Sequence, residues 1–227
     1  VDLDPQNALR NHLGLAFEPG SEEQIAGIAQ LGEAEEDLRE RCQLSPAGVA
    51  VLPFGSVDEN RRRAFERQLD SEPDWLAQRL ADLQLSDGAV VILDTPPGPS
   101  VYLQQALTVA NLALVVTLSD AASYATLPMI DNLIQTYTAE RSEFIGAAYV
   151  INQVDSSRQL NKDVTLIMRN ILGKRLIGLI HRDQSIAEAL AYNQSVLDYD
   201  PSGRGCLDIQ AVSMAVLEKL SSTERSK

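Results

Sequence analysis

The 227 residues carry a formal net charge of −13, and 44% of them are hydrophobic. A chain of this size and composition can bury the core of one large domain. Its negative charge argues against a DNA partner, because much of a protein's affinity for DNA comes from Lys and Arg side chains that neutralise phosphates. The one basic run, Arg61 to Arg63, is expected to be the solvated face of a helix. No apolar run reaches the roughly 20 residues of a membrane span, and the two cysteines are typical of a reducing compartment.

The apolar runs are short and rich in β-branched residues, as in parallel strands covered by helices on both faces. Strands are expected over residues 49–53, 89–93, 112–118, 145–151 and 176–180. Helical spacing predicts helices over 22–42, 59–85 with an interruption near Pro73, 101–110, 127–141, 160–172, 185–193 and 206–220. Ser185 and Glu188 form a capping-box pair at the start of one of them. The alternation predicts a doubly wound, mostly parallel α/β sheet in a single domain over residues 1–220, with a polar tail over 221–227.

Ligands in such folds bind beyond the carboxyl ends of the strands. Asp94 directly follows the run AVVIL, and a buried acid at a strand end needs a cation or hydrogen bonds. In phosphoryl-transfer proteins that cation is often Mg²⁺, held through water. The stiff turn Pro96-Pro97-Gly98 can bring the backbone N–H of Gly98 close to a phosphate. The alternative is an ordinary strand-to-helix turn with Asp94 bonded to loop amides.

Three further strand ends carry polar side chains. Asp2 and Asp4 project to the same side of a strand that runs into a loop, as carboxylates near a metal or an oriented water do, although a solvated pair has the same spacing. Asn152 follows the run IGAAYVI and offers both a donor and an acceptor to the edge of a purine. The loop with His181 and Asp183 follows the last run, and no second histidine stands at metal-ligand spacing.

Five stretches occur in one order along the chain: VDLDPQNALRNHLGL, VVILDTPPG, VINQVD, IHRDQSIAEAL and VLDYDPSGRG. Together they resemble the ParA/MinD group of deviant Walker P-loop ATPases. The resemblance implies a SIMIBI-like P-loop NTPase fold with ATP and Mg²⁺ as cofactors. Within this group, SDAASYATLP and LIHRD are similar to the BcsQ family, ParA-like ATPases encoded with bacterial cellulose synthases.

The resemblance also implies roles on the phosphate side of a nucleotide site. Asp4 would orient the water that attacks the γ-phosphate, and Asp2 would lie near Mg²⁺ and the phosphates. Asn7 belongs to the same switch segment. Asp94 would hold Mg²⁺ through water, while Pro97 and Gly98 belong to the second switch, in which the backbone of Gly98 senses the γ-phosphate.

On the base side, the resemblance implies that Asn152 reads adenine. The loop from Ile180 through His181 to Asp183 would close over the base. Many relatives have proline where this chain has His181.

The family's glycine-rich P-loop is missing: the pattern G-x-x-x-x-G-K-[ST] occurs nowhere in the 227 residues. Either the chain lacks about 35–45 family residues forming the first strand, the P-loop and a helix, or it is a natural pseudo-ATPase. The first explanation is favoured, because a sheet without its central strand exposes two apolar strand edges. As it stands, the chain is expected neither to bind nor to hydrolyse ATP well.

The implied function is an ATP-gated homodimer that supports cellulose synthesis or secretion at the inner membrane of a bacterium, together with other cellulose secretion subunits. A ParA-type partitioning ATPase is the alternative, and the negative charge disfavours its DNA binding. A MinD-type positioning ATPase would need a cationic membrane helix, and residues 212–227 carry few cations. We therefore expect a cytoplasmic protein, recruited to the membrane by partners and not inserted. A catalytically silent scaffold is the remaining alternative.

Overall fold

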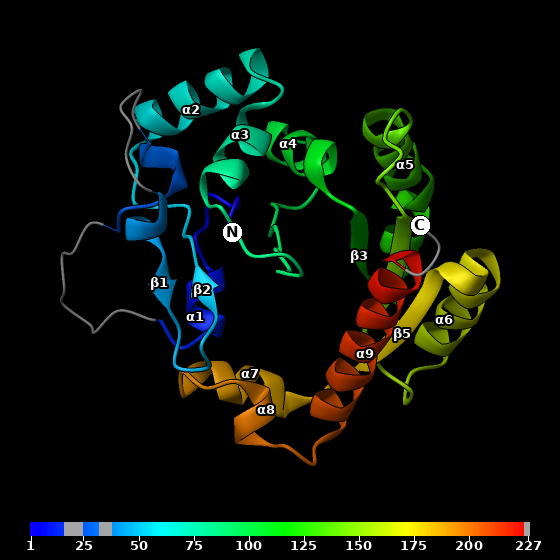
Figure 1. Ribbon diagram of the computed structural model, residues 1–227. Coiled ribbons are helices and arrows are strands. Elements are labelled where there is room, and N and C mark those ends of the chain that lie inside the picture. Colours follow the sequence, from blue (N-terminus) through cyan, green and yellow to red (C-terminus); the bar gives the residue numbers. More distant parts are fainter. Residues whose placement is uncertain (16–24, 32–37, 225–227) are drawn as a thin grey trace. The chain divides into compact units, whose positions relative to one another are not determined.

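The computed structural model describes residues 1–15, 25–31 and 38–224. The chain divides into two compact units, Val1–Val109 and Ala110–Lys227, and each is described by itself (Figure 1). Among the described residues, no helix combines the length and the hydropathy that crossing a membrane requires.

The first unit is built around short strands and three longer helices. Its elements are α1 (Leu9–His12), the 3₁₀ turns η1 (Ile28–Gln30) and η2 (Leu38–Arg41), β1 (Gln43–Leu44), β2 (Ala50–Val51), α2 (Glu59–Ser71), α3 (Trp75–Asp82) and α4 (Val101–Val109). β1 and β2 pair antiparallel. The predicted interruption near Pro73 is confirmed, because α2 ends at Ser71 and α3 begins at Trp75.

The first three residues lie between two other segments of this unit. The N–H of Asp2 donates to the carbonyl of Leu52 over 2.9 Å, and the N–H of Leu3 donates to the carbonyl of Asp94 over 2.8 Å. The run 89–93, predicted as a buried strand, is not a strand in the structure. Asp94, just after it, forms an isolated parallel bridge with Asp2, and the carbonyl of Ile92 accepts from the amino group of Val1 over 2.7 Å. Val90 and Ile92 of the run are 61% and 73% exposed. The prediction of a full strand was wrong, since among the described residues the backbone of this segment pairs with another segment only at Ile92 and Asp94, with residues 1–3.

The helix predicted over residues 22–42 is also wrong where the structure describes the chain. In place of a helix, Ile28 N donates to the carbonyl of Pro53 and Ala29 N to that of Phe54, over 2.9 and 3.0 Å. Residues 16–24 and 32–37 of the chain, on which part of that prediction falls, lie outside the described residues. The apolar side chains of Ile28 and Leu38 are buried by this pairing and by short 3₁₀ turns.

Aromatic rings fill the core of the first unit. Phe54 contacts Phe65 and Tyr102 edge-to-face, and Phe65 contacts Trp75 in the same way, with ring centres 5.1–6.1 Å apart. Gln105 of α4 is buried beside them: its Oε1 accepts from Leu76 N, and its Nε2 donates to the carbonyls of Leu69 and Glu72. One amide side chain thereby connects α2, α3 and α4.

The second unit is a three-stranded parallel sheet with helices. Its elements are β3 (Leu112–Leu118), α5 (Ala121–Thr138), β4 (Gly146–Val154), α6 (Gln159–Leu172), η3 (Gly173–Arg175), β5 (Leu176–His181), α7 (Gln184–Ala191), α8 (Val196–Tyr199) and α9 (Arg204–Glu224). The strand order is β3-β4-β5, with Leu112 opposite Gly146 and Leu118 opposite Asn152. These three strands confirm the predictions for 112–118, 145–151 and 176–180.

Different helices cover the two faces of this sheet. Tyr149 and Ile151 of β4 are fully buried in one cluster with Leu127 of α5 and Met168 of α6. Gly178 of β5 lies on the other face, opposite Val150 in the register, where α9 packs. A Cβ on Gly178 would lie 2.4 Å from Cγ2 of Val212, so a methyl group of α9 occupies the space that a side chain at position 178 would need.

Several helix boundaries in the second unit differ from the prediction. α5 begins at Ala121 and not at residue 127, because Asp120 caps it by accepting from Ser123 N over 2.7 Å. α7 is capped by Asp183, not by Ser185. α9 extends to Glu224, so the first four residues of the expected polar tail continue the helix.

Candidate functional site

Three acids of the first unit gather where the N-terminal segment meets Asp94. Asp2 is fully buried, and its carboxylate accepts from Asp4 N over 2.9 Å and from Leu9 N over 3.3 Å. Burial raises the pKa of Asp2 to about 6. This carboxyl therefore shapes the loop from Asp4 to Leu9 from within, and it does not face the solvent.

Asp4 and Asp94 present carboxyl groups that are only half buried. Oδ1 of Asp4 accepts from Gln6 N over 2.9 Å, within a turn closed by Asn7 N and the carbonyl of Asp4. Burial raises the pKa of Asp94, and the nearby charge of Asp4 raises it further. A divalent cation would offset both effects, and carboxylate oxygens are the ligands that Mg²⁺ prefers. The donor set at Asp94 therefore fits Mg²⁺.

Mg²⁺ is usually held by one or two carboxylates with waters and phosphate oxygens completing the shell. Within residues 1–15, 25–31 and 38–224, no group of three His, Cys, Asp or Glu side chains forms a ready metal cage. Asp94 is a single carboxylate at the end of its segment, so it matches the site of one or two carboxylates and not a cage of three protein side chains.

The two segments of the first unit for which switch roles were expected each contain a residue with positive φ. Asn7 has a φ of 53°, and its Oδ1 accepts from Phe54 N over 3.1 Å, which ties the first segment to the core. Gly98 has a φ of +83°, and a Cβ added to it would meet nothing within 4 Å, so glycine is needed here for conformation and not for space. Pro97 and Gly98 are exposed. The ring of Pro97 and the backbone of Gly98 are thus presented at the surface of the unit.

In the second unit, Asn152 is half buried near the end of β4. Its Oδ1 accepts from Gln153 N over 2.9 Å, and Gln153 has a φ of 54°. The side-chain oxygen is used to hold this bend. Among the described residues the Nδ2 group has no hydrogen-bond partner, so a donor remains for a ligand.

His181 is fixed by residues that sequence reasoning missed. Its Nδ1 lies 2.8 Å from Oδ2 of Asp208, and the same oxygen accepts from the backbone N–H of His181 over 2.9 Å. Arg204 contacts Asp208 over 3.1 Å. The i, i+4 spacing of Arg204 and Asp208 on a helix was the one sequence signal for this pair. The ring is thus held beside α9, and Ile180 precedes it half buried in β5.

Asp183 has a structural task in the same loop. Its Oδ1 accepts from Ser185 N over 3.0 Å and from Ser185 Oγ over 2.6 Å, and its Oδ2 accepts from Gly205 N over 2.7 Å. These bonds, that from the Ser185 hydroxyl first, hold the pKa of Asp183 below its usual value. Asp183 therefore joins the start of α7 to the start of α9.

Asp183→Ala is expected to lower the free energy of unfolding by about 2 kcal/mol at pH 7, since a helix cap is lost and the buried N–H of Gly205 loses its acceptor. A carboxyl with a lowered native pKa stabilises above its unfolded pKa and loses this effect as the pH falls through the native value. The difference between wild type and variant should therefore shrink below about pH 4. Urea unfolding across this pH range measures it, and a difference independent of pH would contradict the assignment.

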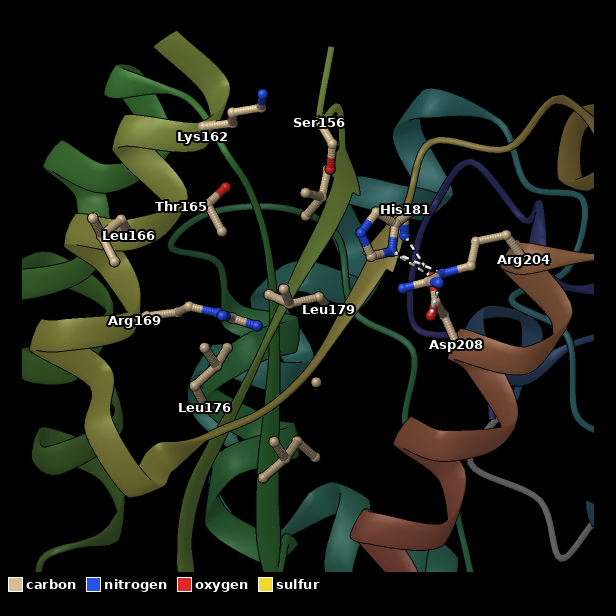
Figure 2. A pocket seen from close by; sticks show the side chains of 13 residues that line it. Ser156, Lys162, Thr165, Leu166, Arg169, Leu176, Leu179, His181, Arg204 and Asp208 are labelled. Carbon is tan, nitrogen blue, oxygen red and sulfur yellow. Dashed lines mark hydrogen bonds and ion pairs between the residues drawn. The ribbon is translucent and has the colours of Figure 1, made fainter. Parts of the chain in front are cut away.

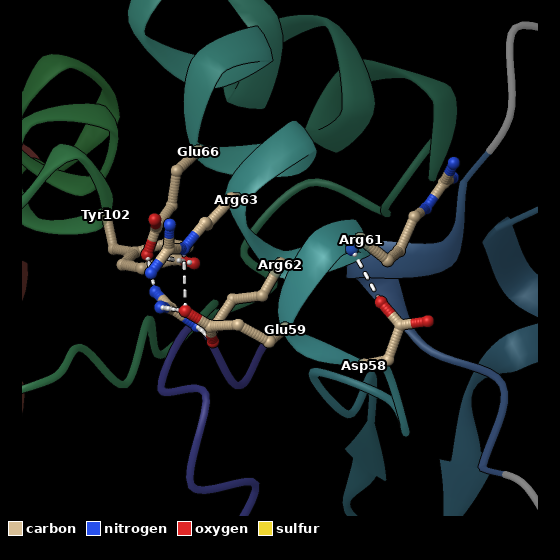
Figure 3. A network of polar contacts seen from close by, with 7 residues as sticks. All are labelled: Asp58, Glu59, Arg61, Arg62, Arg63, Glu66 and Tyr102. Carbon is tan, nitrogen blue, oxygen red and sulfur yellow. Dashed lines mark hydrogen bonds and ion pairs between the residues drawn. The ribbon is translucent and has the colours of Figure 1, made fainter.

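The basic run of α2 is engaged within the first unit (Figure 3). Arg62 pairs with Glu59 over 2.9 Å and also with Glu66, and Arg63 pairs with Glu59 over 2.7 Å. Arg61 donates to the carbonyls of Ala29 and Leu31. The run is thus more than a solvated face, because its charges hold neighbouring carboxylates and backbone.

Comparison with known proteins finds relatives that match almost the whole chain. The virulence plasmid ParA family protein pGP5-D of Chlamydia muridarum is 25% identical over 228 residues, covering 99% of this chain and 82% of that protein. A plasmid partition protein of Borrelia burgdorferi B31, solved with AMPPNP, superposes with a TM-score of 0.74 at 15% identity, covering 96% of this chain and 85% of that one.

The septum site-determining protein MinD of Pyrococcus horikoshii OT3, solved with Mg-ADP, superposes with a TM-score of 0.67 at 15% identity, covering 95% and 80% of the two chains. The fold is thus that of the ParA/MinD class of P-loop NTPases, as the resemblance implied. The profile of the family described as cellulose biosynthesis protein BcsQ matches residues 1–217. The chain belongs to the BcsQ family.

Proposed function

We propose that this protein is an ATP-dependent dimerising ATPase that supports bacterial cellulose synthesis or secretion at the inner membrane. The observation that carries the proposal is the acidic arrangement of the first unit, in which the half-buried carboxyls of Asp4 and Asp94 follow paired segments. Membership of the BcsQ family supports the cellulose role. The nucleotides bound to the solved relatives support ATP and Mg²⁺ as its cofactors.

Each acid would have a separate task in this proposal. Asp94 would hold Mg²⁺ through water, and bound Mg²⁺ supplies positive charge against the phosphates. Asp4 would orient the attacking water with the carboxylate oxygen that its own turn leaves without a hydrogen bond among the described residues. Asp2 would position Asp4, because it accepts the N–H of that residue. The exposed backbone of Gly98 would report the presence of the terminal phosphate.

The base would be recognised by residues of the second unit. Asn152 keeps its Nδ2 donor for this purpose, since its oxygen is used by Gln153. The loop from Ile180 to Asp183 would lie over the base, held in place by the bonds from Asp183 to Ser185 and Gly205. His181 would contribute a ring whose orientation Asp208 sets.

Turnover also needs a phosphate cradle, which the 227 residues do not contain. The test therefore compares the chain alone with a version preceded by a strand and a G-x-x-x-x-G-K-[ST] loop. We expect ATP hydrolysis, and a doubled mass by light scattering with ATP and Mg²⁺ but not with ADP, only for the version with the loop. If the version with the loop had the same mass with ATP as with ADP, the dimerising switch would be overturned. ATP binding without hydrolysis would favour a scaffold.

The cellulose role has its own test. Deletion of the protein in its native bacterium should lower cellulose output, and the version with the loop should restore it. Loss of plasmid or chromosome segregation with unchanged cellulose would favour the partitioning alternative.

A further inference from the structure

The outer edge of β5 borders a cavity of about 660 Å³ in the second unit. In the described part of the chain β5 is the last strand of its sheet. The cavity contacts both Gly178 and Leu179. Gly178 faces α9 and Leu179 packs with the cluster beneath α6, so the two residues face opposite sides of the sheet. A cavity that touches both lies along the strand edge, and we call it the β5-edge groove.

The backbone of β5 presents hydrogen-bonding groups to this groove. Arg182 N donates toward β4, to the carbonyl of Val154, whereas His181 N donates away from β4, to Asp208. Because backbone groups of successive residues alternate between the two edges of a strand, the N–H and C=O of Leu179 point outward with the N–H of His181. The carboxylate of Asp208 already occupies the outer edge at His181. The outward N–H and C=O of Leu179, next to this position, can pair with an added strand.

The walls of the groove bring cations together in an acidic chain. On the α6 wall, Lys162 and Arg169 are exposed, and they form no ion pair with any described residue. On the α9 wall, Arg204 pairs with Asp208. Figure 2 shows Lys162 and Arg169 on one side of the groove, Arg204 on the other. The positive charge exceeds the negative charge here, although the whole chain carries −13.

The floor of the groove is apolar. Leu176 and Leu179 of β5 lie between the two walls in Figure 2, and Leu166 lies on α6. Leu166 is 59% exposed. Apolar side chains at alternate positions of an added strand would cover this surface.

We propose that the β5-edge groove binds an extended acidic segment of a partner protein, which adds a strand beside β5. The main chain of Leu179 would pair with that segment, while carboxylates of the segment would lie against Lys162 and Arg169. Charge complementarity selects an acidic occupant, and the strand edge selects an extended one. This goes beyond the nucleotide switch, because the addition of a strand beside β5 requires no nucleotide.

The probe is a fluorescent peptide of about ten residues, near the upper length of a strand, that alternates Glu with Val. We expect saturable binding to the full chain by fluorescence polarisation, weakening as salt is raised. The double variant Lys162→Glu/Arg169→Glu should weaken binding about tenfold, as two reversed ion contacts do. Lys174→Glu is the matched control, since Lys174 is exposed outside the groove and its reversal should leave affinity unchanged.

Two further measurements separate strand addition from simple charge attraction. Peptide N-methylated at alternate residues should lose binding, and bound peptide should slow hydrogen exchange at the amide of Leu179. Equal binding of the N-methylated peptide, or of a Lys–Val peptide, would overturn the proposal. So would full displacement by inorganic phosphate at constant ionic strength, which would indicate a small-anion site. Absence of binding at millimolar peptide would also overturn it. All of these outcomes are measured without ATP, so they test the groove independently of the proposed ATP-dependent dimerisation.

Discussion

Asp4→Ala, placed in the version of the chain that carries a P-loop, is expected to lower kcat for ATP hydrolysis by about 10²–10⁴-fold. The carboxylate of Asp4 is half buried and held by Gln6 N, so it is oriented before any ligand binds. Removing it leaves Asp2 and Asp94 in place to position the segment and the cation. ATP-dependent dimerisation should therefore persist, and the dimer should become long-lived because hydrolysis no longer opens it.

Steady-state phosphate release and light scattering measure these two effects together. The matched control is Asp87→Ala, since Asp87 is an exposed acid of the same unit whose side chain forms no ion pair with any described residue and has no proposed role. It should leave both measurements unchanged. Full hydrolysis by Asp4→Ala would show that another group orients the water. Loss of dimerisation together with hydrolysis would instead give Asp4 a role in binding.

Gly27→Ala is expected to destabilise the first unit by about 3 kcal/mol or more. The backbone of Gly27 is extended, with a φ of −152°, so alanine meets no conformational strain there. Its Cβ would, however, lie 2.4 Å from the backbone nitrogen of Gly55 and 2.5 Å from the carbonyl carbon of Phe54. Backbone atoms cannot turn aside as a flexible side chain can, so the two segments must separate.

Urea unfolding followed by the fluorescence of Trp75, the single tryptophan, reports on this unit. Gly48→Ala is the control: Gly48 has a φ of +78° and open space around a Cβ, so only left-handed strain of about 1 kcal/mol is expected. If Gly27→Ala cost no more than this control, the close contact between the two segments would be contradicted.

The parallel strands of the second unit could be predicted from local sequence because each is a continuous apolar run. β3 coincides with the predicted run, and β4 and β5 differ from prediction by a few residues at their ends. The same argument failed at residues 89–93 because an apolar run does not reveal how many partners it has. It failed at Ile28 because helical spacing also arises when apolar residues are buried by distant backbone, here that of Pro53 and Phe54.

The candidate site was only partly accessible to sequence reasoning. The strand-end rule located Asp94 and Asn152, and the family resemblance supplied a role for Asp4. Neither could indicate that the carboxylate of Asp183 binds two helix starts, or that Asp208 holds His181. Those contacts join residues 22 and 27 positions apart, and they exist only once α9 has packed on the sheet.

The close packing of Gly178 against Val212 also constrains how this protein can evolve. A larger residue at position 178 requires a smaller one at position 212, since a Cβ on Gly178 would overlap the methyl group of Val212. We therefore expect a larger residue at position 178 in a relative to be accompanied by a smaller one at position 212. Residues on the outer surface of α9 do not carry this restriction. They can therefore change while the packing of α9 against the sheet is kept.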